Sequence, residues 1–115
     1  MSWFNADDKM HSHPKSRRAG LEAMGLWLLA GTLCTDYLTD GLVPAWYVRS
    51  WPGGERLAQV LIDSGFWEPA GEDYQFLSWS EYQRTKEKVL EDREAARVRM
   101  AEWRAAHPKV KKPKE

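Results

Sequence analysis

The stretch ERLAQVLIDSGFWEPAGEDYQF, residues 55–76, combines two hydrophobic periods on either side of Gly65. In residues 55–64 the apolar side chains recur every three or four positions, which predicts an amphipathic helix. Gly65 stands where such a helix commonly ends. After it, two short segments with the alternating pattern of strands flank residues 69–73. This arrangement predicts a β-hairpin with a loop of about five residues.

The residues before this stretch predict two further helices and a short strand. Residues 21–35 are apolar on nearly every side, which is typical of a helix buried at the centre of its domain. Residues 42–43 have the character of a short strand that Pro44 terminates. Pro44 can also open a short helix over residues 45–51, and the Pro-Gly-Gly sequence at residues 52–54 breaks it.

The two ends of the chain extend this central region. Residues 2–4 are short and apolar, so they form either an edge strand or an arm that packs on the domain. Pro14 is well placed to start a helical turn. From Ser80 onward the chain is highly charged, and Ser80 with Gln83 has the form of a capping box. We therefore expect one continuous helix over residues 80–106.

The order of helix, short strand, helix, helix and hairpin is that of a winged helix-turn-helix, with a long C-terminal helix added. The expected fold class is mainly α (α+β). We expect a winged-helix domain with an N-terminal arm at residues 1–79, a long charged helix at residues 80–106 and a basic disordered tail at residues 107–115.

The composition limits the classes of function. Seventeen basic and seventeen acidic residues give a net charge of zero, which excludes a uniformly basic nucleic-acid coat. Seven tryptophans argue for a packed globule. The single cysteine, Cys34, forms no internal disulfide, and this favours a reducing compartment. The uncharged residues 23–34 are fewer than the ~20 that span a bilayer, and no apolar secretory signal is seen. We expect a cytoplasmic protein with no membrane partner.

No residues form a recognisable catalytic, cofactor or metal site. His11 and His13 have His-x-His spacing, but no cysteine or acidic cluster supports a zinc site beside them. Gly53 and Gly54 follow a predicted helix rather than a strand, so they do not form a phosphate-binding loop. The neighbouring acids lie on predicted loops rather than across a cleft. We therefore expect a protein that is not an enzyme and that has no cofactor and no small-molecule substrate.

Several segments match a known family in order and spacing. They are His13-Pro14-Lys15, Gly25-Leu26-Trp27, Thr39-Asp40-Gly41-Leu42-Val43-Pro44, Leu57-Ala58 with Leu61, Ser64-Gly65-Phe66-Trp67-Glu68, and Tyr74-Gln75-Phe76 with Trp79, Tyr82 and Gln83. The chain resembles, over residues 13–104, the winged-helix replication-initiation or DnaD-like proteins of actinobacteria and their phages. The resemblance implies a role with DNA in replication initiation or transcriptional regulation. It departs at Leu77-Ser78-Trp79, where the family commonly has His-Asp-Trp.

Charge argues against the usual DNA contact of this fold, in which the third helix enters the major groove. Residues 54–76 contain one cation, Arg56, and five acids, and phosphates repel such a surface. Arg56 and Gln59 remain able to read base edges. Split at Ser80, the body carries a net charge of −4 and residues 81–115 carry +4. This division moves the expected contact with a polyanion toward the C-terminal end.

We predict salt-dependent binding of DNA through cations and one amide in four regions of the chain. The candidate nucleic-acid-binding residues are Lys15, Arg17, Arg18, Arg56, Gln59, Arg97, Arg104, Lys109, Lys111 and Lys112.

A protein-interaction module is the alternative. Tyr82, Val89, Ala96 and Trp103 recur every seven residues, and Met100 lies on an adjacent row. An exposed tryptophan is a typical interface anchor, so we predict a partner-binding or self-association surface at Met100 and Trp103. In this alternative the acidic hairpin and the C-terminal helix bind a host or phage protein.

Overall fold

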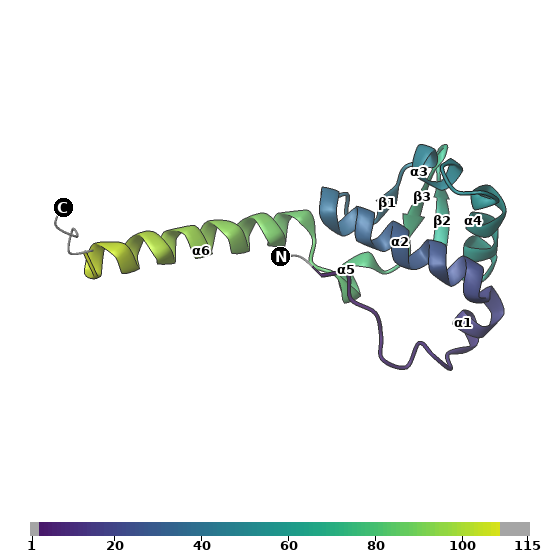
Figure 1. Cartoon of the computed structure of the whole chain (residues 1–115), viewed down its shortest axis with the longest axis horizontal. Helices are drawn as coiled ribbons and strands as arrows, with labels where there is room; N and C mark the ends of the chain where they lie inside the picture. Colours follow the sequence, from purple (N-terminus) through teal and green to yellow (C-terminus); the bar gives the residue numbers. More distant parts are fainter. Residues whose placement is uncertain (1–2, 109–115) are drawn as a thin grey trace, which may run out of the picture. The chain divides into compact units, whose positions relative to one another are not determined.

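The structure of the protein, a computed structural model, describes residues 3–108. It consists of two compact units, one ending at Thr85 and the other beginning at Lys86. The architecture is α+β, with helices, a small three-stranded antiparallel sheet and a long C-terminal helix (Figure 1). In chain order the elements are α1 (Pro14–Ala19), α2 (Leu21–Tyr37), β1 (Leu42–Val43), α3 (Ala45–Arg49), α4 (Gly54–Asp63), β2 (Trp67–Ala70), β3 (Asp73–Phe76), α5 (Trp79–Tyr82) and α6 (Lys86–Ala106).

The sheet of the first unit has the strand order β1-β3-β2, with antiparallel neighbours. Its register pairs Leu42 with Gln75 and Trp67 with Phe76. The core forms where α2 and α4 pack on each other and on the strands (Figure 1). The largest fully buried side chains are those of Trp67, Leu61, Val43, Val48 and Cys34.

The prediction for residues 55–76 is confirmed apart from the length of the hairpin loop. α4 ends at Asp63, directly before the Ser64-Gly65 turn. Only Gly71 and Glu72 join the two strands, instead of the five expected residues. The loop is this short because Gly71 takes a φ of 65°, which the first central residue of a type II′ turn requires. Pro69 is accommodated because β2 is an edge strand of the sheet.

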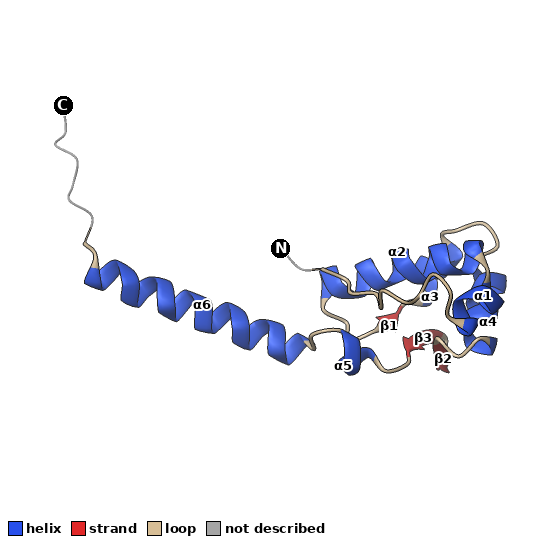
Figure 2. Cartoon of the chain, turned by 90° about the horizontal axis from the view of Figure 1, so that it is seen from below, coloured by secondary structure: helices blue, strands red, loops and turns tan. Residues whose placement is uncertain are grey.

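The central helix is buried on one side only, so the expectation of all-round burial was wrong. Ala23, Leu26 and Ala30 of α2 are buried, whereas Leu28 and Leu29 are about half-exposed. The strands lie on one side of α2 (Figure 2). A unit of this size has too few elements to enclose a helix completely, and apolar side chains therefore remain on its outer face.

The prediction of one continuous helix over residues 80–106 was wrong at the start of this segment and is confirmed at its end. The chain forms the short helix α5 and then becomes extended at Gln83 (φ −117°, ψ 152°) before α6 begins at Lys86. Gln83 does not complete a capping box, because its side-chain amide bonds to the backbone of Asn5. Its Nε2 donates to the Asn5 carbonyl (2.6 Å), and its Oε1 accepts from the Asn5 N–H (2.8 Å).

The N-terminal residues form an arm rather than an edge strand, which decides between the two alternatives left by the sequence. The Phe4 ring lies 4.9 Å from the Trp27 ring and 6.0 Å from the Trp79 ring, measured between centroids. It occupies a notch over Gly31, where an added Cβ would lie 2.4 Å from ring atoms of Phe4. Phe4 and the Asn5–Gln83 hydrogen bonds therefore hold the arm on the first unit.

This notch gives a test of the arm by a matched pair of substitutions in α2. Gly31→Ala is expected to lower the free energy of unfolding by about 1–3 kcal/mol, because the new methyl group displaces the Phe4 ring. Gly25→Ala, in the same helix, meets no atom within 4 Å and is expected to raise it by up to ~1 kcal/mol through helix propensity. Urea denaturation followed by circular dichroism measures both. Equal effects of the two variants would show that Phe4 does not occupy the notch.

Candidate nucleic-acid interface

The exposed face of α4 holds the two predicted base-reading side chains in contacts with acids. The Arg56 guanidinium lies 3.3 Å from the Glu22 carboxylate of α2. The Gln59 amide donates to the carboxylate of Asp63, one turn further along α4, at 2.9 Å. Both contacts are at the surface, where such pairs contribute ~0–1 kcal/mol. The two acids thus reduce the positive potential of this face, but these weak contacts leave the Arg56 and Gln59 side chains able to change conformation.

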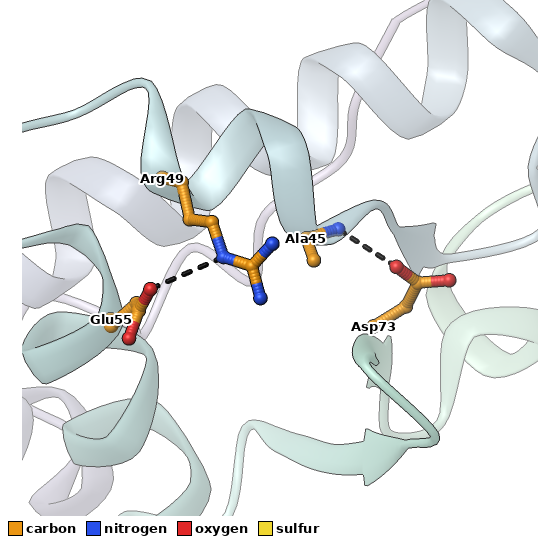
Figure 3. A network of polar contacts seen from close by, with 4 residues as sticks. All are labelled: Ala45, Arg49, Glu55 and Asp73. Carbon is orange, nitrogen blue, oxygen red and sulfur yellow. Dashed lines mark hydrogen bonds and ion pairs between the residues drawn. The ribbon is translucent and has the colours of Figure 1, made fainter.

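The last residue of α3 is a cation, Arg49, that sequence analysis did not assign to the site. Arg49, at the end of α3, donates from Nε to the Glu55 carboxylate at 3.2 Å (Figure 3). No local pattern indicated this pair, since the two residues belong to different helices. Arg49, which ends α3, and Arg56, in the first turns of α4, thus each have an acidic partner.

The hairpin is acidic and has a structural role. Asp73, at the start of β3, accepts a hydrogen bond from the Ala45 N–H at 2.8 Å (Figure 3). Pro44 precedes α3 and offers no side-chain cap, so Asp73 satisfies this helix terminus from another element. Glu68 and Glu72 are exposed. The hairpin therefore presents carboxylates where a DNA-binding wing would present cations.

α1 places its three cations at the surface of the first unit. Pro14 is the first residue of the helix, as predicted, and His13 caps it by accepting the Lys15 N–H at Nδ1 (3.1 Å). Lys15, Arg17 and Arg18 are exposed, and their side chains form no ion pair with any residue between positions 3 and 108.

Most of the charges of α6 are separated by sign onto two sides of the helix, while Lys88, Asp92 and Arg99 share a third side. At 3.6 residues per turn, the spacings of seven, four and seven positions bring four cations onto one side, with no acid among them. We call these four the basic stripe: Lys86, Arg93, Arg97 and Arg104. Four acids gather on the adjoining side: Glu87, Glu91, Glu94 and Glu102.

Two residues of the basic stripe carry charges with no acidic partner. Arg97 donates from Nε to Glu94 at 3.0 Å, and this bond lowers the pKa of the Glu94 carboxyl. Arg93 and Arg104 make no ion pair with any residue that the structure describes. Arg93 was not among the predicted site residues, although its position seven residues after Lys86 and four before Arg97 was a usable signal.

The predicted partner surface lies beside the basic stripe on α6. Met100 and Trp103 are 49% and 54% exposed. The Trp103 ring stacks on His107 with a centroid separation of 4.6 Å. Tyr82, the first member of the seven-residue pattern, belongs to α5 and is exposed, so the pattern does not continue into the first unit as one helical stripe.

The structure thus distributes the predicted residues over three helices. Lys15, Arg17 and Arg18 are together on α1, Arg56 and Gln59 on α4, and Arg97 and Arg104 on α6. The predicted contacts at Lys109, Lys111 and Lys112 lie outside the described residues.

No candidate metal centre is seen in the part of the chain that the structure describes. Among residues 3–108, no three His, Cys, Asp or Glu side chains gather closely enough to hold a metal ion. Burial raises the pKa of the Cys34 thiol to about 11, which keeps it protonated at neutral pH. Within the same residues, no helix combines the length and the apolar character needed to cross a bilayer.

Comparisons of this chain with family models, curated proteins and solved structures found no match.

Proposed function

We propose that the protein is a winged-helix protein that binds DNA, with the basic stripe of α6 as its main contact. The winged-helix assignment is supported by the chain order α2, β1, α3, α4, β2, β3 and by a sheet in which β1 joins the hairpin. In this assignment α3, the turn at residues 50–53 and α4 form the helix-turn-helix, and β2 and β3 form the wing.

The observation that carries the proposal is the segregation of charge on α6. Four cations lie along one side, and Arg93 and Arg104 form no ion pair with any acid among residues 3–108. The helix has 21 residues, which extend over roughly 30 Å and so can follow several phosphates. The cations of α1 supply a second, smaller contact. The acidic hairpin and the paired Arg56 make α4 the weaker candidate.

The resemblance to phage and actinobacterial replication-initiation proteins supports a role in replication initiation or transcriptional regulation in the cytoplasm. The protein acts in this proposal by binding and assembly, without catalysis.

A pair of double variants tests the DNA contact. Arg93→Gln with Arg104→Gln removes two charges from the basic stripe, and Lys88→Gln with Arg99→Gln removes two at the same spacing from another side of α6. We expect the wild type to bind labelled duplex DNA with an affinity that falls steeply between about 50 and about 200 mM salt. The first double variant should reduce the slope of log K against log salt by about 1–2, since each phosphate contact contributes ~0.9.

The control double variant should change this slope by less than half as much. Equal losses from both double variants would show that net charge, rather than the basic stripe, causes binding. No binding at the lower salt concentration would contradict the DNA proposal.

Protein binding through α6 is the second candidate function, favoured by the exposure of Trp103. We expect Trp103→Ala to weaken self-association or partner binding at least about tenfold, because buried aromatic anchors dominate interface energies. Val98→Ala, an exposed apolar residue on another side of α6, is the control. Sedimentation velocity over a range of concentrations measures self-association, and titration of a co-purified protein measures partner binding. Unchanged association in the Trp103→Ala variant would exclude this surface.

A further inference from the structure

A pocket of about 340 Å³ lies between the N-terminal arm and the rest of the first unit. Its walls include the rings of Phe4, Trp27, Phe66 and Phe76, together with polar side chains such as those of Asp7, His13 and Lys15. The volume is near the lower limit of the ~300–1,000 Å³ found for small-molecule pockets. A concave, aromatic space of this size suits a small ligand with a flat apolar body.

The arm that makes one wall is held by the reciprocal Asn5–Gln83 hydrogen bonds and by a third bond from the Asn5 Nδ2 to the Tyr82 carbonyl, at 3.1 Å. Phe4 anchors the same segment on Trp27. A ligand would therefore enter an ordered site and would not bear the cost of closing the arm.

The polar groups around the pocket differ in whether they already have a hydrogen-bond or ion-pair partner within the protein. The Asp7 carboxylate accepts the Lys9 N–H at 2.9 Å, and this bond lowers its pKa. His13 uses Nδ1 to cap α1. The Lys15 ammonium lies 6.0 Å from the centroid of the Phe66 ring and pairs with no acid among residues 3–108. An unpaired cation thus lies against an aromatic wall.

We propose that this pocket binds a small aromatic carboxylate. The flat ring packs among Trp27, Phe66 and Phe76, and the carboxylate pairs with the Lys15 ammonium, with His13 as the second polar neighbour. No residue of the basic stripe on α6 lines this pocket, whereas Lys15 also belongs to the smaller DNA contact proposed for α1.

Two probes of nearly the same shape test the chemistry of the site. 1-Naphthoate carries the carboxylate, and 1-naphthamide replaces it with an uncharged amide. We expect 1-naphthoate to shift the indole N–H signals of Trp27 and Trp79 in proton–nitrogen NMR spectra in a saturable manner, while the signal of Trp103 stays in place. 1-Naphthamide should bind about 5- to 10-fold more weakly. Equal affinities would overturn the carboxylate assignment, and no saturable shift at Trp27 or Trp79 would overturn the site.

A matched pair of variants on α1 tests the cation. Lys15→Gln should reduce 1-naphthoate affinity to that of 1-naphthamide, and Arg17→Gln, which removes the same charge from an exposed position outside the pocket, should leave it unchanged. Both residues are at the surface, so neither change affects folding substantially. Equal losses of 1-naphthoate affinity in the two variants would show that the probe responds to net charge alone. An unchanged affinity in Lys15→Gln would contradict the assignment of Lys15 as the partner of the carboxylate.

Discussion

Gly54→Ala is expected to lower the free energy of unfolding by at least about 3 kcal/mol and to leave much of the first unit unfolded at physiological temperature. A Cβ at this position would lie 1.8 Å from the carbonyl oxygen of Val48 and 2.8 Å from its carbonyl carbon. These are backbone atoms, so only a shift of α3 against α4 relieves the overlap.

That shift is costly because α3 is held at both ends. Val48 has no exposed surface, Ala45 is bonded to Asp73, and Arg49 pairs with Glu55. Urea denaturation followed by circular dichroism measures the loss. The same replacement at Gly25, which meets open space, is the control and should not destabilise the protein. A Gly54→Ala variant within 1 kcal/mol of the wild type would contradict the close approach of the two helices.

Trp67→Ala is the second substitution expected to have a large effect, with a loss of about 3–5 kcal/mol. Trp67 is 1% exposed, and its ring lies 5.6 Å from Tyr74 and 5.4 Å from Phe76 between centroids. Truncation to alanine leaves a cavity where α4 meets the hairpin, and the surrounding rings cannot fill it fully. Thermal and urea denaturation report this loss directly.

Two controls separate the cavity from other effects of removing a tryptophan. Trp67→Phe keeps a ring and removes the indole Nε1, which is buried and has no hydrogen-bond partner among residues 3–108. It should therefore cost less than half as much as Trp67→Ala. Trp46→Ala removes a tryptophan that is 61% exposed and should change stability by less than ~0.5 kcal/mol. Similar losses at Trp67 and Trp46 would contradict the assigned core.

Features that depend on neighbouring residues were predicted well. The amphipathic period of residues 55–64 predicted α4, Gly65 predicted its end to within about one residue, and Pro14 predicted the start of α1. The spacing of cations along α6 also follows from residues within one helix. Periodicity and backbone preference are properties of short segments, and they act in the same way wherever the segment lies in the fold.

Features that depend on distant residues were missed or predicted wrongly. Ser80 and Gln83 have the local form of a cap, but Gln83 bonds instead to Asn5, 78 positions away. The sequence pattern placed Asp73 in a loop, whereas in the structure its carboxylate accepts a hydrogen bond from the N–H of Ala45, 28 positions earlier. The pocket beneath the arm combines residues from positions 4 to 83 and has no signature in any single segment.

Local sequence patterns therefore predicted the order of the elements from α1 to β3, the approximate bounds of α2 and α4, the end of α6 and the distribution of charge along the chain. The start of α6, the acidic partners of the cations and the side chains that line the pocket depend on the folded arrangement of the chain. The physical reason is the range of the interactions. Backbone propensity and hydrophobic periodicity act within a few residues, whereas hydrogen bonds, ion pairs and ring contacts join whatever groups the folded chain brings together.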